Sequence, residues 1–148
     1  MKNQEIAGIF NEIAGLLEIK GENPFRIRAY RRAAQNIEGH AKNIADLSRE
    51  ELLEIPGIGK DLADKIEEYL KTGKVVSYED LKKEVPEGLA ELLSVPSLGP
   101  KTAKFLHERL KIKNIDELEK LAGEHKLAGL PGIKEKTEEN IIRGIEML

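Results

Sequence analysis

Apolar residues recur at helical spacing along most of the chain. Near the N-terminus they form one stripe that consists of Ile6, Ile9, Phe10, Ile13, Leu16 and Leu17. A second helix is predicted after the break at residues 21–24, with Phe25, Ala29, Ala33 and Ile37 at steps of four. No stretch alternates apolar and polar residues as a half-buried strand does. These patterns predict an all-α fold.

Capping and stop signals predict the remaining helices. Ser48 followed by Glu51 is a capping box, which opens a short helix that ends near Ile55. Signals of the same kind predict three helices over 60–72, 100–110 and 135–148. Two more helices are predicted to start at Ser77 and at Asn114.

A sequence repeat lies at three of the predicted helix starts. Its copies read Ile55-Pro56-Gly57-Ile58-Gly59, Val95-Pro96-Ser97-Leu98-Gly99 and Leu130-Pro131-Gly132-Ile133-Lys134. In the first two copies an alanine and an aliphatic residue follow at the same spacing, which indicates equivalent hairpins. The third copy has Lys134 in place of the second glycine. Two interpretations of it stay open, a degenerate third hairpin and a packing turn.

A turn of this composition has the properties of an anion site. Glycine accepts positive φ and has no Cβ to hold another backbone at a distance. The apolar residue between the glycines fills the space between the two helices. Unpaired N–H groups at the start of the second helix, together with its dipole, then attract an anion. Such contacts position a protein on DNA without reading bases.

The first two copies therefore supply the candidate DNA-binding groups. These groups are Gly57, Ile58, Gly59 and Lys60 in the first copy, and Leu98, Gly99, Lys101 and Thr102 in the second. A monovalent cation, Na⁺ or K⁺, is a further candidate ligand, bridging to the same phosphates. Its site would be the backbone carbonyls of Ile55, Ile58, Val95 and Leu98.

An arginine-rich segment forms a second candidate site. It contains Arg26, Arg28, Arg31 and Arg32, with Tyr30 among them. Arg28 and Arg32 share one helix face. One interpretation is a clamp on phosphates with Tyr30 stacked on a base. The alternative is a solvated helix face with Tyr30 half-buried.

Composition narrows the function classes without choosing one. Apolar residues make up 40% and charged residues 34% of the 148, as in an ordinary soluble protein. The net charge of −3 is unusual for a DNA-binding domain, although backbone binding needs only a few donors on one face. The absence of cysteine excludes disulfides and thiolate metal sites, and the N-terminal stripe is too polar for a membrane span. We expect a cytoplasmic monomer with no membrane partner.

Three groups of motifs follow one another along the chain. The first contains residues 23–34 (Asn-Pro-Phe-Arg-Ile-Arg-Ala-Tyr-Arg-Arg-Ala-Ala), the first hairpin and residues 65–74 (Lys-Ile-Glu-Glu-Tyr-Leu-Lys-Thr-Gly-Lys). The second contains residues 97–103 and 115–118, and the third residues 130–145. In this order they resemble the N-terminal region of family X DNA polymerases, the DNA polymerase beta type. The third group resembles the bacterial and archaeal branch.

The resemblance covers essentially the whole chain and implies two helical subdomains built on helix-hairpin-helix motifs. Residues 1–76 would form the lyase-type N-terminal domain, and residues 77–148 the second subdomain with the degenerate third hairpin. In the family this region binds gapped or nicked DNA during repair, including base excision repair. The palm signature of the DNA-directed polymerase is absent here, so this chain alone should not polymerise.

The resemblance also raises the alternative of a metal-independent abasic-site (5′-deoxyribose phosphate) lyase. Lys65 aligns with the family's nucleophilic lysine, which attacks the sugar aldehyde as a neutral amine. Asp61 and Glu68 are placed to hold its proton, so we expect an ion-pair partner instead. Asp61 and Arg26 also stand where the family has further lysines. A second alternative is a helical protein-interaction adaptor, which predicts an exposed apolar groove and no affinity for DNA.

Overall fold

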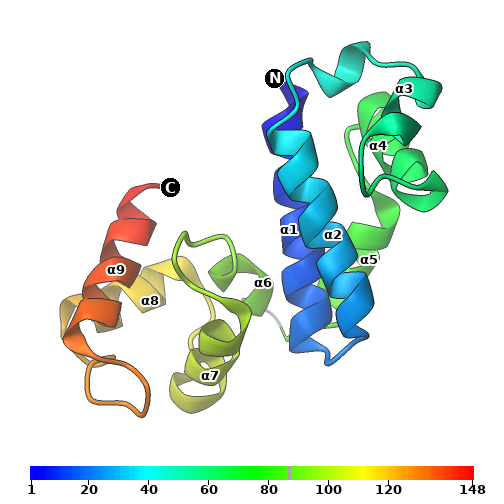
Figure 1. Ribbon diagram of the computed structural model, residues 1–148. Coiled ribbons are helices and arrows are strands. Elements are labelled where there is room, and N and C mark those ends of the chain that lie inside the picture. The colour runs from blue at the N-terminus through cyan, green and yellow to red at the C-terminus, as the bar shows by residue number, and fades with distance from the viewer. Residues whose placement is uncertain (87) are drawn as a thin grey trace. The chain divides into compact units, whose positions relative to one another are not determined.

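The computed structural model describes residues 1–86 and 88–148. These residues form nine α-helices and one short 3₁₀ helix, and no strand occurs among them (Figure 1). The predicted all-helical fold is therefore confirmed. Backbone contacts divide the chain into two units, Met1–Glu84 and Val85–Leu148. Helix α5 (Val76–Lys83) belongs to the first unit, because it packs against α1, whereas the predicted boundary after residue 76 would assign it to the second.

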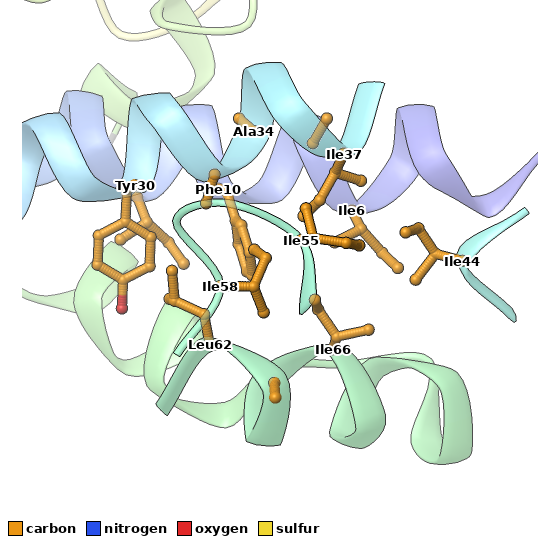
Figure 2. Close-up of a cluster of buried hydrophobic side chains, with 14 of the residues drawn as sticks. Ile6, Phe10, Tyr30, Ala34, Ile37, Ile44, Ile55, Ile58, Leu62 and Ile66 are labelled. Carbon is orange, nitrogen blue, oxygen red and sulfur yellow. The ribbon is translucent and has the colours of Figure 1, made fainter. Parts of the chain in front are cut away.

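The first unit is built on two long helices that lie side by side, α1 (Lys2–Ile19) and α2 (Pro24–Glu38) (Figure 1). The 3₁₀ helix η1 (Ile44–Asp46), α3 (Arg49–Glu54) and α4 (Lys60–Thr72) follow. The predicted stripe of α1 forms much of the core, with Ile9 only partly buried. Side chains of the turn between α3 and α4, Ile55 and Ile58, enter the same core (Figure 2).

The buried face of α2 differs from the predicted one. Phe25 is 74% exposed, whereas Tyr30 is 2% exposed and its ring meets that of Phe10 edge-on, with centroids 5.6 Å apart. Steps of four residues advance about 40° beyond a full helical turn, so three such steps carry Phe25 about 120° away from Ile37. The buried stripe therefore runs through Tyr30 and Ala33 to Ile37, and Phe25 lies outside it.

Two of the three predicted caps form. Ser48 and Glu51 make the reciprocal capping box of α3. In the second unit, Asn114 Oδ1 accepts the N–H of Glu117, 2.8 Å away. Ser77 does not cap α5, which begins one residue earlier. The N–H of Val76 donates instead to the carboxylate of Glu68, at 3.0 Å.

The described residues of the second unit form four helices, α6 (Leu89–Leu92), α7 (Pro100–Leu110), α8 (Ile115–Gly123) and α9 (Glu135–Glu146). Its buried side chains come from every helix and from the turns; they include Leu89, Leu92, Val95, Leu98, Leu106, Ile112, Leu118, Leu127, Ile133 and Ile141. Among the residues that the structure describes, no helix is long and apolar enough to cross a membrane.

Candidate nucleic-acid interface

The three repeat copies form turns of the same backbone geometry. We name them hairpin 1 (residues 55–59), hairpin 2 (95–99) and hairpin 3 (130–134). In each, the N–H of the fourth residue donates to the carbonyl of the first, at 3.0 Å in hairpin 1, 3.1 Å in hairpin 2 and 2.9 Å in hairpin 3. The third residue has positive φ in all of them: Gly57 at 89°, Ser97 at 72° and Gly132 at 81°. Hairpin 3 is therefore a true hairpin turn despite its degenerate sequence.

The two glycine positions have different roles. The last residue of each hairpin is the N-cap of the next helix and has negative φ: −95° at Gly59, −78° at Gly99 and −102° at Lys134. Any residue adopts such values, so Lys134 does not disturb the turn. A Cβ on Gly59 or Gly99 would meet no described atom within 4 Å. These glycines leave the helix N-terminus open to an approaching molecule, whereas Gly57 takes a positive φ, which glycine adopts without strain and which Ser97 also adopts in hairpin 2.

The predicted phosphate-binding groups of hairpin 1 lie at the surface. Gly57, Gly59 and Lys60 are exposed, while the side chain of Ile58 is 4% exposed and fills the core (Figure 2). Ile58 can therefore offer only its backbone. In the described chain, no backbone hydrogen bond uses the N–H groups of Gly59, Lys60 or Asp61. These donors and the positive end of the α4 dipole together suit an anion.

Hairpin 2 has a similar arrangement with a more basic surface, but Pro100, at the position of Lys60, has no N–H to donate. Gly99 and Lys101 are exposed, Thr102 is half-buried and Leu98 is a buried plug at 5% exposure. Lys101 and Lys104 occupy the positions that Asp61 and Asp64 occupy after hairpin 1. Hairpin 2 therefore has lysines where hairpin 1 has two aspartates, each of which is paired with a basic side chain, Asp61 with Lys65 and Asp64 with Arg49.

Besides the apolar side chains of the core, Asn36 and Arg32 of α2 reach hairpin 1. The Asn36 amide donates to the carbonyl of Pro56, at 2.6 Å. The Arg32 side chain runs along Gly57, with its Cγ 3.5 Å from the position that a Cβ there would take. Sequence reasoning missed Asn36, because nothing in its local sequence indicates a partner twenty residues away. Of the four arginines, Arg32 is the one that the structure brings to a hairpin.

The other three arginines lie in different surroundings. Arg31 pairs with Glu18 at 3.0 Å. The Arg28 guanidinium lies 4.8 Å from the ring centroid of the exposed Phe25. Arg26 lies 6.0 Å from the ring centroid of Tyr30 and lines a hollow that also contains acidic residues. A separate shallow hollow on α2 has no acidic residue among its lining, which consists of Phe25, Arg28, Ala29, Arg31, Arg32 and Gln35.

This arrangement corrects the predicted role of Tyr30. Its ring is 2% exposed in the core, so it cannot stack on a base. The aromatic ring that stands among the arginines at the surface is that of Phe25.

Lys65 is held by one of its two expected partners. Its Nζ lies 2.8 Å from Oδ1 of Asp61, and its side chain is 13% exposed. The expected contact with Glu68 does not form, and the carboxylate of Glu68 accepts the N–H of Val76. Burial alone would lower the pKa of Lys65, but Asp61 and the Tyr30 hydroxyl outweigh it and raise the pKa above its ordinary value. The amine is therefore charged at neutral pH.

Hairpin 3 lacks the preceding helix that hairpins 1 and 2 have. Residues 124–129 form turns and bends, and the carboxylate of Glu138 accepts the N–H groups of Leu127 and Ala128, at 3.0 and 2.7 Å. His125 Nδ1 lies 2.8 Å from the same carboxylate. Glu138 occupies the repeat position of Ala63 and Ala103, and this charged residue at an alanine position is the signal that sequence reasoning missed.

Comparison with known proteins agrees with this geometry. Residues 1–75 match the family model described as a helix-hairpin-helix domain. The chain belongs to this helix-hairpin-helix family. Residues 89–146 match the model of a SAM-like helix-hairpin-helix tandem, which covers hairpins 2 and 3.

A curated relative matches nearly the whole of this helix-hairpin-helix chain. Over 145 residues, 98% of the chain, it is 34% identical to the DNA polymerase/3'-5' exonuclease PolX of Bacillus subtilis (strain 168). The chain spans 25% of the length of that protein. The resemblance to the helix-hairpin-helix region of family X DNA polymerases is thereby confirmed.

Proposed function

We propose that this chain binds the sugar-phosphate backbone of DNA without reading base sequence, as the DNA-binding region of a family X polymerase acting at gaps or nicks in repair. The observation that carries the proposal is the repeated hairpin geometry. Two exposed helix N-termini, each after an open glycine, present backbone N–H groups that suit phosphates. The similar PolX protein is named a DNA polymerase, and this supports the proposal that the phosphates belong to DNA.

The charges near the hairpins suit this ligand although the net charge is −3. Arg32 and Lys60 accompany hairpin 1, and Lys101 and Lys104 follow hairpin 2. Phosphate binding depends on the local field at the contact, so acidic residues elsewhere on the surface do not prevent it.

The shallow hollow on α2 that contains Phe25, Arg28 and Arg32, which we name the arginine face, supports a preference for DNA with unpaired nucleotides. Phe25 offers an exposed ring for a base, and Arg28 and Arg32 offer charges for the flanking phosphates. Intact duplex keeps its bases stacked inside the helix, whereas a gap leaves bases free to contact Phe25. Gapped DNA is therefore the ligand that uses the hairpins and this face together.

A monovalent cation would complete each hairpin contact. The carbonyl of Ile55 accepts one N–H, that of Ile58, and keeps a lone pair; Val95 and Leu98 repeat this arrangement in hairpin 2. Na⁺ or K⁺ held by the carbonyls of Ile55 and Ile58, or of Val95 and Leu98, would bring further positive charge to the phosphate. In this proposal the chain acts as a monomer in the cytoplasm.

The two alternative functions have less support. The Lys65 amine pairs with Asp61 and so is poorly suited to attack an aldehyde, which requires the neutral form. An adaptor would need a continuous apolar groove. The exposed large apolar side chains in the described part of the chain are scattered, except for the adjacent Met147 and Leu148: Met1, Phe25, Leu53, Val76, Met147 and Leu148.

The test is binding to three labelled DNAs at low and moderate salt: intact duplex, nicked duplex and duplex with a short gap bearing a 5′-phosphate. We expect the tightest binding to the gapped DNA and a steep loss of affinity with salt. Equal, weak binding to all three would contradict the preference for gaps. No binding, or binding that salt does not weaken, would contradict the proposal as a whole.

A further inference from the structure

Asp61 places a negative charge within the anion site of hairpin 1. It is the second residue of α4, so its own N–H is among the free donors at this helix N-terminus. Its side chain is 74% exposed. A carboxylate here is stabilised by the helix dipole but repels a phosphate that approaches the same N–H groups. Hairpin 2 has Lys101 at the equivalent position and meets no such conflict.

Lys65 restrains this carboxylate. It lies one turn further along α4, with its Nζ 2.8 Å from Asp61 Oδ1. The partners differ in exposure, 13% for the Lys65 side chain against 74% for Asp61, so the lysine is the fixed member of the pair. The ion pair therefore restrains the carboxylate and offsets its charge.

We propose that Lys65 is a positioning residue of the phosphate site: it acts through Asp61, by holding the carboxylate aside, rather than as a direct phosphate ligand or a nucleophile. The inference rests on the proposed function, since it assumes that hairpin 1 binds a DNA phosphate. It explains how hairpin 1 can accept an anion although an acidic residue stands in the first turn of α4. It also assigns Lys65 a role that depends on its remaining charged.

A double-mutant cycle on the affinity for gapped DNA tests the proposal. Lys65→Met leaves Asp61 uncompensated, and we expect about fivefold weaker binding, the effect of roughly one nearby charge in water. Asp61→Asn removes the repulsion and should strengthen binding about two- to fivefold. In the Asp61→Asn background, Lys65→Met should change affinity less than about twofold, because no carboxylate remains to be held.

The sign of the coupling energy between the Lys65 and Asp61 substitutions distinguishes a positioning role of Lys65 from direct contact with the phosphate. If Lys65 itself binds the phosphate, its loss will cost as much or more in the Asp61→Asn background, and that result would overturn the proposal. An effect on unfolding alone, with unchanged affinity, would also overturn it. Lys71→Met, in the last turn of the same helix, is the control and should bind within about twofold of the unmodified protein.

Two further variants keep the test decisive. If Lys65→Met does not fold, Lys65→Gln provides the same comparison with a polar side chain of similar length. Gly59→Val tests the underlying function separately. If Gly59→Val does not weaken binding, hairpin 1 is not a phosphate site and the proposed function fails there. If Gly59→Val weakens binding while the two charge substitutions act additively, only the inference about Lys65 fails.

Discussion

Gly144 of α9 and Pro96 of hairpin 2 approach so closely that a Cβ on Gly144 would stand 2.1 Å from the Pro96 carbonyl oxygen. One turn earlier on α9, the Ser97 hydroxyl donates to the Asn140 carbonyl, 2.9 Å away. The tip of hairpin 2 is therefore fixed by backbone contact with a neighbouring helix. Gly144 has no positive φ, so it is required here for space alone.

Gly144→Ala should destabilise the second unit by about 1–3 kcal/mol, because the added methyl group forces α9 and hairpin 2 apart. Urea unfolding measures this loss. Gly123→Ala in α8 is the matched control, since its Cβ would meet no described atom within 4 Å. The control should be at least as stable as the unmodified protein, because alanine favours a helix more than glycine does. If both variants are equally stable, the close approach of Gly144 to Pro96 relaxes without any loss in the free energy of unfolding.

The two glycines of hairpin 1 should respond differently to substitution. Gly59 has φ of −95° and open space around it, so Gly59→Val should cost less than about 1 kcal/mol in stability. Its side chain would nevertheless keep a phosphate away from α4, and DNA affinity should fall about tenfold. Gly57→Val, at φ of 89°, should destabilise the fold itself by about 1–3 kcal/mol. Unchanged affinity of Gly59→Val would identify hairpin 1 as a mere connector.

The sequence predicted the hairpins well, because local turn chemistry determines them. It left hairpin 3 open on the assumption that its last position needs glycine, whereas the φ of −102° at Lys134 suits any residue. It misplaced Phe25 and Tyr30 because strict four-residue steps drift around a helix. Glu138 was missed although it stands at a position where the other two copies of the repeat have alanine. That position signals an unusual residue, but its partners, the N–H groups of Leu127 and Ala128, are backbone groups that the sequence does not identify.

Hairpin 2 should contribute strongly to the salt dependence of binding. Each phosphate contact releases counterions, so Lys101→Ala should reduce the slope of log K against log salt by about 0.9. Titrations of duplex DNA at four or more salt concentrations give this slope. Lys120→Ala, in the last turn of α8, is the control and should leave the slope unchanged. Parallel lines for Lys101→Ala and the unmodified protein would exclude a contact between Lys101 and a phosphate.

Phe25 should affect binding without affecting the fold. Since the side chain is 74% exposed, Phe25→Ala should unfold at the same urea concentration as the unmodified protein. A stacked base contributes about 1–3 kcal/mol, so affinity for gapped DNA should fall at least about fivefold, with little change for intact duplex. Phe25→Tyr, which keeps a ring, should restore the preference. Equal losses on gapped and intact DNA would point to a backbone contact instead.

Glu138 should make the stability of the second unit depend on pH. Burial favours its neutral form, but hydrogen bonds from Ala128, His125 and Leu127 outweigh burial and lower its pKa in the folded state. A lowered folded-state pKa stabilises the fold above the ordinary carboxylate range, and this stabilisation is lost as the pH falls through the lowered value. Glu138→Gln should therefore be less stable at pH 7, and its difference from the unmodified protein should shrink in acid.

Urea unfolding at pH 7, 5 and 3.5 measures this convergence. Glu139→Gln is the matched control, because Glu139 is exposed and its contact with Arg143 is loose, at 3.9 Å. This control should follow the unmodified protein at every pH. If the loss of stability of Glu138→Gln stays constant with pH, the shape of the side chain and not its charge stabilises the segment that precedes hairpin 3. Convergence would show that the charge itself holds the N–H groups of Leu127 and Ala128.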